Sequence, residues 1–113
     1  MHIQVNTDHN IAGREALADH VRSAVSEALS RFSSHITRVE AHLSDPSGEN
    51  PGGSSAHDDK RCMLEARIEG RQPLAVTHEA ATLHQAVDAA AGKLSRMIEH
   101  TLGRAARSDG PQA

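Results

Sequence analysis

Hydrophobic residues recur along the chain with two different periods, and the changes of period divide the sequence into six segments. Alternation of apolar and polar residues predicts a strand, because successive side chains of a strand point to opposite faces of a sheet. Recurrence every three to four residues predicts a helix with one face against a core. The predicted strands are His2–Thr7, Ile36–Leu43, Lys60–Glu69 and Gln72–Thr77. The predicted helices are Ala12–Phe32 and Leu83–Arg107.

Each predicted helix carries one apolar stripe that should face a common core. The stripe of the first helix is Leu17, Val21, Ala24, Val25, Ala28, Leu29 and Phe32. The stripe of the second is Leu83, Val87, Ala90, Ala91, Leu94, Met97, Ile98 and Thr101. Thr82 and Gln85 stand three residues apart at the start of the second helix, which is the spacing of a capping box.

The order of the segments, β-α-β-β-β-α, predicts the architecture. A strand, a helix and a second strand normally give a parallel pair with a right-handed connection. Pro73 places the last strand at an edge of the sheet, because proline has no amide hydrogen to donate. We therefore predict an α+β, two-layer fold, in which two helices cover one face of a four-stranded mixed sheet.

The chain of 113 residues is long enough for a single domain, which we assign to residues 1–107. Residues 44–59, SDPSGENPGGSSAHDD, are rich in Ser, Gly and Pro and predict a flexible loop between two strands. The polar residues 108–113 predict a disordered tail.

Charge is segregated by sign on the second helix. At roughly 100° per residue, five basic side chains fall within an arc of roughly 80°, whereas Asp88 and Glu99 lie on another side. We call the five residues the basic stripe: Lys93, Arg96, His100, Arg104 and Arg107. A stripe of one sign is typical of a helix that binds phosphates. A solvated helix face is the alternative, and the helix alone leaves both interpretations open.

Composition limits how the protein could bind a nucleic acid. The net charge is −3 with the nine histidines neutral, so attraction to a polyanion would have to come from a local patch. The chain contains one Phe and no Trp or Tyr. Binding would therefore depend on charge and shape, since the aromatic platforms on which bases stack are missing.

Other chemistries find little support in the sequence. The histidines are scattered singly, and only His78 and His84 are placed to meet, so we expect no metal site. Cys62 shares a strand face with Leu64 and predicts a buried, unreactive thiol. There is no nucleophile motif and no phosphate-binding glycine loop, so we expect no enzyme, no cofactor and no small-molecule substrate.

The sequence shows no sign of a membrane or an export route. No segment approaches the 18 consecutive apolar residues of a membrane helix, and residues 1–10 lack the basic and apolar regions of a signal peptide. The single cysteine cannot form an internal disulfide, which fits a reducing compartment. We expect a cytoplasmic protein with no membrane partner.

Three segments in this order carry a resemblance to a known family. They are ALADHVRSAVSEALSRFSSHITRVEAHLSD, DKRCMLEARIEG and LHQAVDAAAGKLSRMI. The chain resembles the hibernation-promoting factor and ribosome-associated inhibitor family, also called sigma-54 modulation or ribosomal subunit interface proteins, in its short form. The resemblance implies a fold like that of double-stranded-RNA-binding domains. It also implies a non-enzymatic stress-response factor that occupies the tRNA and mRNA channel of the small ribosomal subunit, inhibits translation and protects idle ribosomes.

The resemblance also implies which residues would contact ribosomal RNA. Lys93 and Arg96 match the family's Lys-Leu-x-Arg pattern, and His100, Arg104 and Arg107 extend it. Lys60 and Arg61 match a basic pair that is common in relatives. The sequence departs from the family at Ala24 and Glu27, where typical members carry lysine, and at His84, where they carry an aromatic residue.

A second function of a different class stays open. The same fold could be a ribosome-independent interaction module that self-associates through its sheet face or through the edge strand near Leu74. We expect a monomer, and the alternative would make a homodimer. Binding through phosphates should weaken steeply with salt, whereas apolar or strand-edge association should not.

Overall fold

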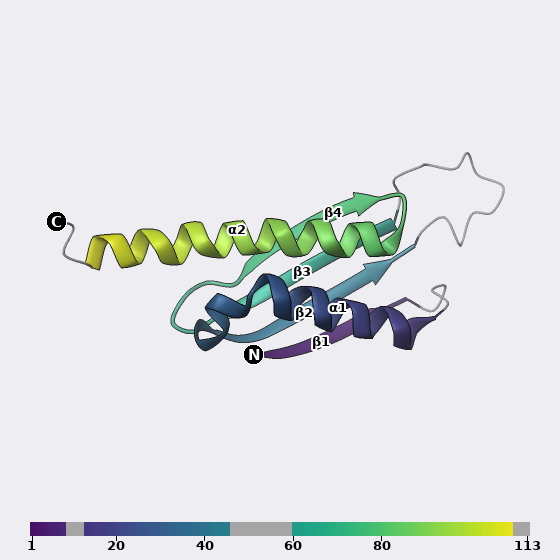
Figure 1. Cartoon of the computed structure of the whole chain (residues 1–113), viewed down its shortest axis with the longest axis horizontal. Coiled ribbons are helices and arrows are strands. Elements are labelled where there is room, and N and C mark those ends of the chain that lie inside the picture. Colours follow the sequence, from purple (N-terminus) through teal and green to yellow (C-terminus); the bar gives the residue numbers. More distant parts are fainter. Residues whose placement is uncertain (9–12, 46–59, 110–113) are drawn as a thin grey trace.

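Two helices cover one face of a four-stranded sheet, and the other face is open (Figure 1). The computed structural model describes residues 1–8, 13–45 and 60–109, without the side chains of residues 104–109. Its strands are β1 (His2–Thr7), β2 (Ile36–Ser44), β3 (Lys60–Ile68) and β4 (Leu74–Ala80). Its helices are α1 (Arg14–Ala28), the 3₁₀ helix η1 (Ser30–His35) and α2 (Leu83–Asp109). The predicted fold class is confirmed.

The strands lie in the sheet in the order of the sequence, β1-β2-β3-β4. β1 and β2 are parallel, as the crossover through α1 predicts, and the other two pairs are antiparallel. β4 is an edge strand, as Pro73 indicated. The predicted loop 44–59 connects β2 to β3, and residues 46–59 lie outside the described residues.

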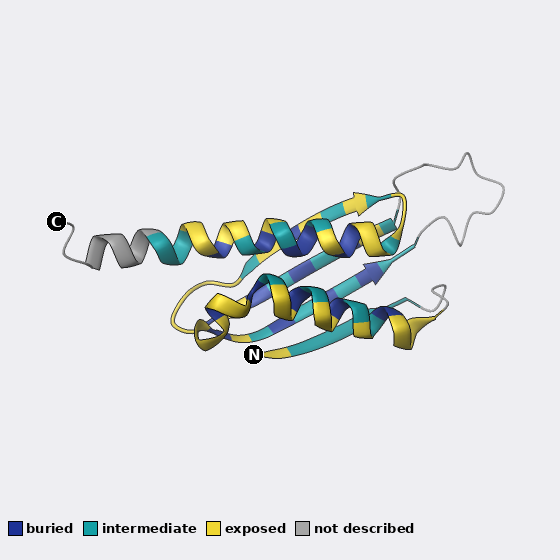
Figure 2. Cartoon of the chain, viewed as in Figure 1, coloured by how far each residue is buried: buried dark blue, intermediate teal, exposed yellow. Residues whose placement is uncertain are grey.

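The core lies between the sheet and the two helices (Figure 2). Val39 and Leu64 contribute from the sheet, Val25 from α1 and Leu94 from α2, and none of the four is exposed to solvent. Residues of the opposite parity in β2 and β3 point to the open face, where they are partly or fully exposed. The alternating pattern of the sequence therefore identifies the buried face correctly.

The first helix is shorter than predicted. α1 ends at Ala28 and Leu29 leaves the helical conformation, with φ −108° and ψ 12°. The chain continues as η1, in which the amide of Phe32 donates to the carbonyl of Leu29 at 2.9 Å. A 3₁₀ helix has three residues per turn, so Leu29 and Phe32 still face the core together.

The predicted bounds of the last strand, Gln72–Thr77, are wrong. Gly70 adopts φ 75° in the turn after β3, and the amide of Arg71 donates to the carbonyl of Ile68 at 3.0 Å. Pro73 precedes β4, which then pairs with β3 as far as Ala80 opposite Lys60. The strand therefore begins and ends later than the apolar residues alone indicate.

α2 begins at Leu83, as predicted, and the amide of Gln85 donates to the hydroxyl of Thr82 at 3.1 Å. Most of its predicted core stripe is buried, but Met97 is 38% exposed and Thr101 is not part of the core. Ala86, which lies outside the predicted stripe, is buried. Met97 lies at the margin of the stripe next to the basic residues, beyond the width that the sheet and α1 cover. The helix continues to Asp109, two residues into the predicted tail, and residues 110–113 lie outside the described part.

Candidate nucleic-acid interface

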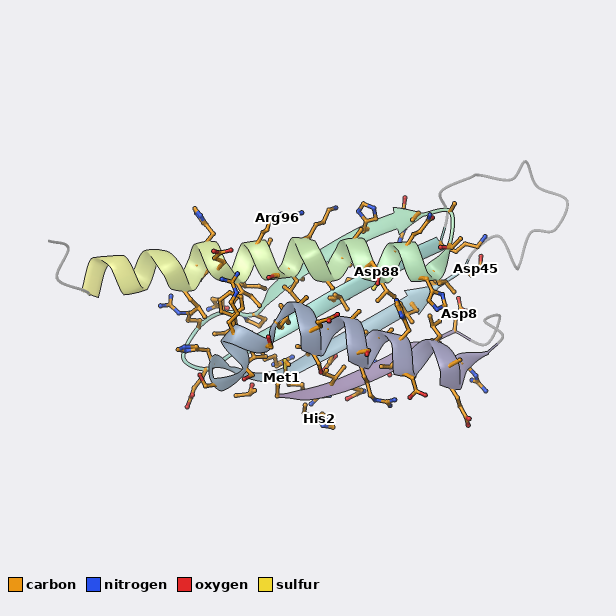
Figure 3. All side chains as sticks on the ribbon, in the orientation of Figure 1. Met1, His2, Asp8, Asp45, Asp88 and Arg96 are labelled. Atoms are coloured by element: carbon orange, nitrogen blue, oxygen red, sulfur yellow. The ribbon has the colours of Figure 1, made fainter. Side chains whose placement is uncertain are left out.

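Asp88 and Glu99, the acidic residues of α2 whose side chains are described, lie on the flank next to α1 and η1. Oδ1 of Asp88 is 2.8 Å from Nε2 of His20, and Oε1 of Glu99 accepts from Nη2 of Arg31 at 3.1 Å. Figure 3 shows Asp88 on the side of α2 that faces α1, and Arg96 on the opposite side. The acidic flank is therefore used for contacts within the protein, whereas Lys93, Arg96 and His100 of the basic stripe are exposed.

Lys93, the first residue of the basic stripe, is held against the edge strand. Its Nζ atom donates to the backbone oxygen of Thr77 in β4 at 3.1 Å. A lysine ammonium carries three hydrogens, so two remain for another acceptor. The side chain is exposed at the boundary between α2 and β4.

Arg96 is more available to a ligand than Lys93. It is exposed, and its guanidinium has no hydrogen-bond or ion-pair partner among the described residues. Its Nη1 atom lies 3.7 Å from the position that a Cβ atom on Gly92 would occupy, so the side chain folds back over the preceding turn. His100 is exposed one helical turn further on, whereas the side chains of Arg104 and Arg107 lie outside the described part.

Lys60 and Arg61 lie on β3 and not on α2, and they point away from each other because neighbours in a strand face opposite sides of the sheet. Nζ of Lys60 lies 3.7 Å from Oδ1 of Asp45. Nε and Nη2 of Arg61 lie 3.2 and 3.1 Å from Oε2 of Glu79, on the open face. Each cation is therefore paired with a carboxylate, and the two do not form one basic surface.

The outer surface of α1 is neutral to acidic, as the sequence indicates. Arg22 is paired with Asp19 of the same helix at 3.4 Å, and no other basic side chain joins them in the shallow hollow over this face. A small groove of about 250 Å³ separates α1 from α2. It is lined by Ala24, Glu27, Ala28, Asp88, Ala91 and Gly92. Its described lining carries two carboxylates and no cation, so it offers nothing to a phosphate.

Four arginines in the described part of the chain have guanidinium groups without a hydrogen-bond or ion-pair partner. They are Arg14, Arg67, Arg71 and Arg96. Only Arg96 belongs to the predicted site. Arg71 follows the glycine of the β3–β4 turn, where neither periodicity nor the family pattern marks it.

His84 and Cys62 make contacts within the fold. His84 packs against His20, with ring centroids 4.3 Å apart, and not against His78. Within residues 1–8, 13–45 and 60–103, no group of three His, Cys, Asp or Glu side chains could hold a metal ion. Cys62 is buried, and loss of solvation raises the pKa of its thiol from 9.0 to about 12. No described helix is both long enough and apolar enough to cross a membrane.

Comparison with known families identifies the chain. The sequence profile of the family described as "Sigma 54 modulation protein / S30EA ribosomal protein" matches residues 3–105. The chain belongs to this family. It is a family of ribosome-associated modulation proteins and not of enzymes, which agrees with the absence of catalytic motifs from the sequence.

Two solved structures share the fold of this sigma 54 modulation family member. The N-terminal domain of Thermus thermophilus Protein Y superposes with a TM-score of 0.68 and 19% identity, over 89% of this chain and 99% of that one. A ribosomal subunit interface protein from Coxiella burnetii superposes with a TM-score of 0.63 and 14% identity, over 91% and 99%. Comparison with curated protein sequences finds no match. At these identities the structures support the fold alone.

Proposed function

We propose that this member of the family is a cytoplasmic hibernation factor. In this proposal it binds the small ribosomal subunit, inhibits translation and contacts ribosomal RNA through the basic stripe of α2. The family assignment supports a ribosomal partner, and the sequence resemblance supports the small subunit and the inhibitory role. Residues 1–107 would act as one domain and one copy of the chain as the binding unit.

The observation that carries the proposal is the separation of charge on α2. Asp88 pairs with His20 and Glu99 pairs with Arg31, so these carboxylates do not neutralise the basic residues on the opposite flank of α2. Lys93 and Arg96 are exposed there, and Arg96 has no partner in the described part of the chain. Exposed cations without intramolecular partners can displace the counterions of an RNA backbone at little cost to the fold.

The same contacts count against the self-association alternative. On the open sheet face, Glu40 is 2.9 Å from Nη2 of Arg38 and 3.4 Å from Nε2 of His42, so the Glu40 carboxylate is already paired. At the β4 edge, Lys93 covers the carbonyl of Thr77 and adds a charge, which is how natural edge strands avoid pairing with another chain. These contacts make both surfaces less suited to pairing with a second copy.

Co-sedimentation with purified small ribosomal subunits at low salt tests the proposal. We expect wild-type protein to pellet with the subunits and Lys93→Glu/Arg96→Glu to remain in the supernatant. A matched control is Arg14→Glu/Arg67→Glu, which makes the same change in net charge at two exposed arginines outside the stripe. The control should still pellet.

All four positions lie outside the core, so we expect both variants to fold, and thermal unfolding checks this. Equal pelleting of the stripe variant and wild type would remove the stripe from the mechanism. Absence of wild-type pelleting would contradict the ribosomal function itself.

A further inference from the structure

A groove of about 680 Å³ lies between the β3–β4 turn and the C-terminal half of α2. It is lined by Gly70, Arg71, Gln72, Leu74 and Thr101. Figure 1 shows that α2 runs past this end of the sheet, so the turn lies beside the helix and not beneath its start. The groove is open to solvent and includes Leu74 of β4, the strand that Lys93 of the basic stripe also contacts.

The lining of the groove suits an anion. Arg71 offers a guanidinium that has no partner among the described residues, Gln72 an amide and Thr101 a hydroxyl, and the described part of the lining contains no carboxylate. A guanidinium presents its N–H groups in a planar fork that matches two oxygens of one phosphate. Arginines that are paired with a carboxylate, such as Arg61 with Glu79, are not available for this role.

The groove lies beside the basic stripe, toward the C-terminus of α2. Thr101 is turned about 100° around the helix from His100, toward the core side, and it lies eight residues after Lys93, which corresponds to about 12 Å along the helix axis. A strand whose phosphates contact Lys93 and Arg96 would reach Arg71 by following α2 toward its C-terminus. The acidic groove between α1 and α2 lies on the opposite flank and would direct the strand toward this side.

We propose that this groove binds a backbone phosphate of ribosomal RNA and that Arg71 is its main ligand. This inference rests on the proposed function, and it extends the RNA-binding surface from one helix to the β3–β4 turn. It also places the RNA on the α2–β4 side of the protein. Gly70, whose φ is 75°, permits the turn that brings Arg71 to the groove.

The inference is tested by the affinity of the full chain for purified small ribosomal subunits, measured at salt concentrations from about 50 to about 300 mM. Arg71→Ala should remove one phosphate contact. The slope of log K against log salt should then become less steep by about 0.7, and binding at 0.1 M salt should weaken about fivefold. Arg71→Lys keeps the charge and should restore the slope. Arg67→Ala is the matched control, since Arg67 is an exposed arginine four residues earlier that points to the open sheet face.

The possible outcomes separate the inference from the function on which it rests. A reduced slope for Arg71→Ala, with wild-type slopes for Arg67→Ala and Arg71→Lys, supports the groove. Wild-type affinity and slope for Arg71→Ala, with binding still lost in Lys93→Glu/Arg96→Glu, would overturn the groove and leave the proposed function standing. Equal losses for Arg71→Ala and Arg67→Ala would overturn it as well, since the effect would then be one of net charge. Lack of binding by the wild type would contradict both.

Discussion

The Nζ atom of Lys93 lies 3.1 Å from the backbone oxygen of Thr77, which joins the basic stripe of α2 to the edge strand of the sheet. The hydrogen bond connects α2 to β4, which is the edge strand of the sheet. It also restricts the lysine to one side of the helix. Lys93 thus has a structural contact as well as its proposed role in RNA binding, whereas Arg96 has only the latter.

Alanine substitutions should separate the two roles. Lys93→Ala removes the hydrogen bond to Thr77 and should lower the free energy of unfolding by about 0.5–1 kcal/mol, since the group is exposed. Arg96→Ala removes no contact within the described residues and should change it by less than about 0.5 kcal/mol. Urea unfolding measures both, and both variants should bind small subunits more weakly. Equal stability of the two variants would show that the Thr77 contact contributes nothing.

Two glycines should respond to alanine in opposite directions. Gly92 lies inside α2, and a Cβ atom there would meet only Nη1 of Arg96 at 3.7 Å, an ordinary contact. Gly92→Ala should therefore raise the free energy of unfolding by about 0.5–1 kcal/mol. Gly70→Ala should lower it by about 1 kcal/mol, because residue 70 has φ 75°. Thermal unfolding measures both, and a destabilised Gly92→Ala would contradict the helical environment described for Gly92.

The contact of His20 with Asp88 should couple α1 to α2. A double-mutant cycle of His20→Ala and Asp88→Ala is expected to give a coupling energy of about 0.3–1 kcal/mol in favour of the pair, which is the range for partly exposed ion pairs. Arg22 and Asp19 form the matched control within α1, 3.4 Å apart, and should couple by about 0.3 kcal/mol or less. Coupling of His20 with Asp88 that is no larger than in this control would remove the link between the helices.

The sequence could predict the fold because its hydrophobic periods are long and regular. Val39 and Leu64 are buried as their alternation predicts. The 3₁₀ turn was missed because Leu29 and Phe32 are three residues apart, and such a short stretch does not distinguish a period of 3.0 from one of 3.6. Met97 was misplaced because a stripe of eight positions is wider than the surface that packs against α2.

The candidate site was only partly predictable. Helix geometry places Lys93 and Arg96 on one flank, and it could also have separated Lys60 from Arg61, since adjacent strand residues face opposite ways. No periodic pattern could have placed Arg71 beside Thr101, because the path of a turn relative to a distant helix depends on tertiary packing. The partners of Asp88 and Glu99 lie 68 residues away in the chain and were hidden for the same reason.

Burial of Cys62 should make stability depend on alkaline pH. The pKa of this thiol rises from 9.0 to about 12 on folding, so the folded state retains its proton while the unfolded state loses it. The contribution is fully present below pH 9 and decreases as pH rises toward 12. Urea unfolding from pH 8 to 11 should show a steeper loss of stability for wild type than for Cys62→Ala. Parallel curves would contradict this, as would rapid reaction of the native thiol with a disulfide reagent.

The salt dependence of wild-type binding to purified small ribosomal subunits tests the central proposal most directly. Four or five cations in contact with phosphates predict that log K falls against log salt with a slope of roughly −3 to −4. That slope, reduced in the Arg96→Ala variant, would support recognition of ribosomal RNA through the basic stripe. Binding that does not change with salt would contradict the proposal, and so would a lack of binding even at about 50 mM salt.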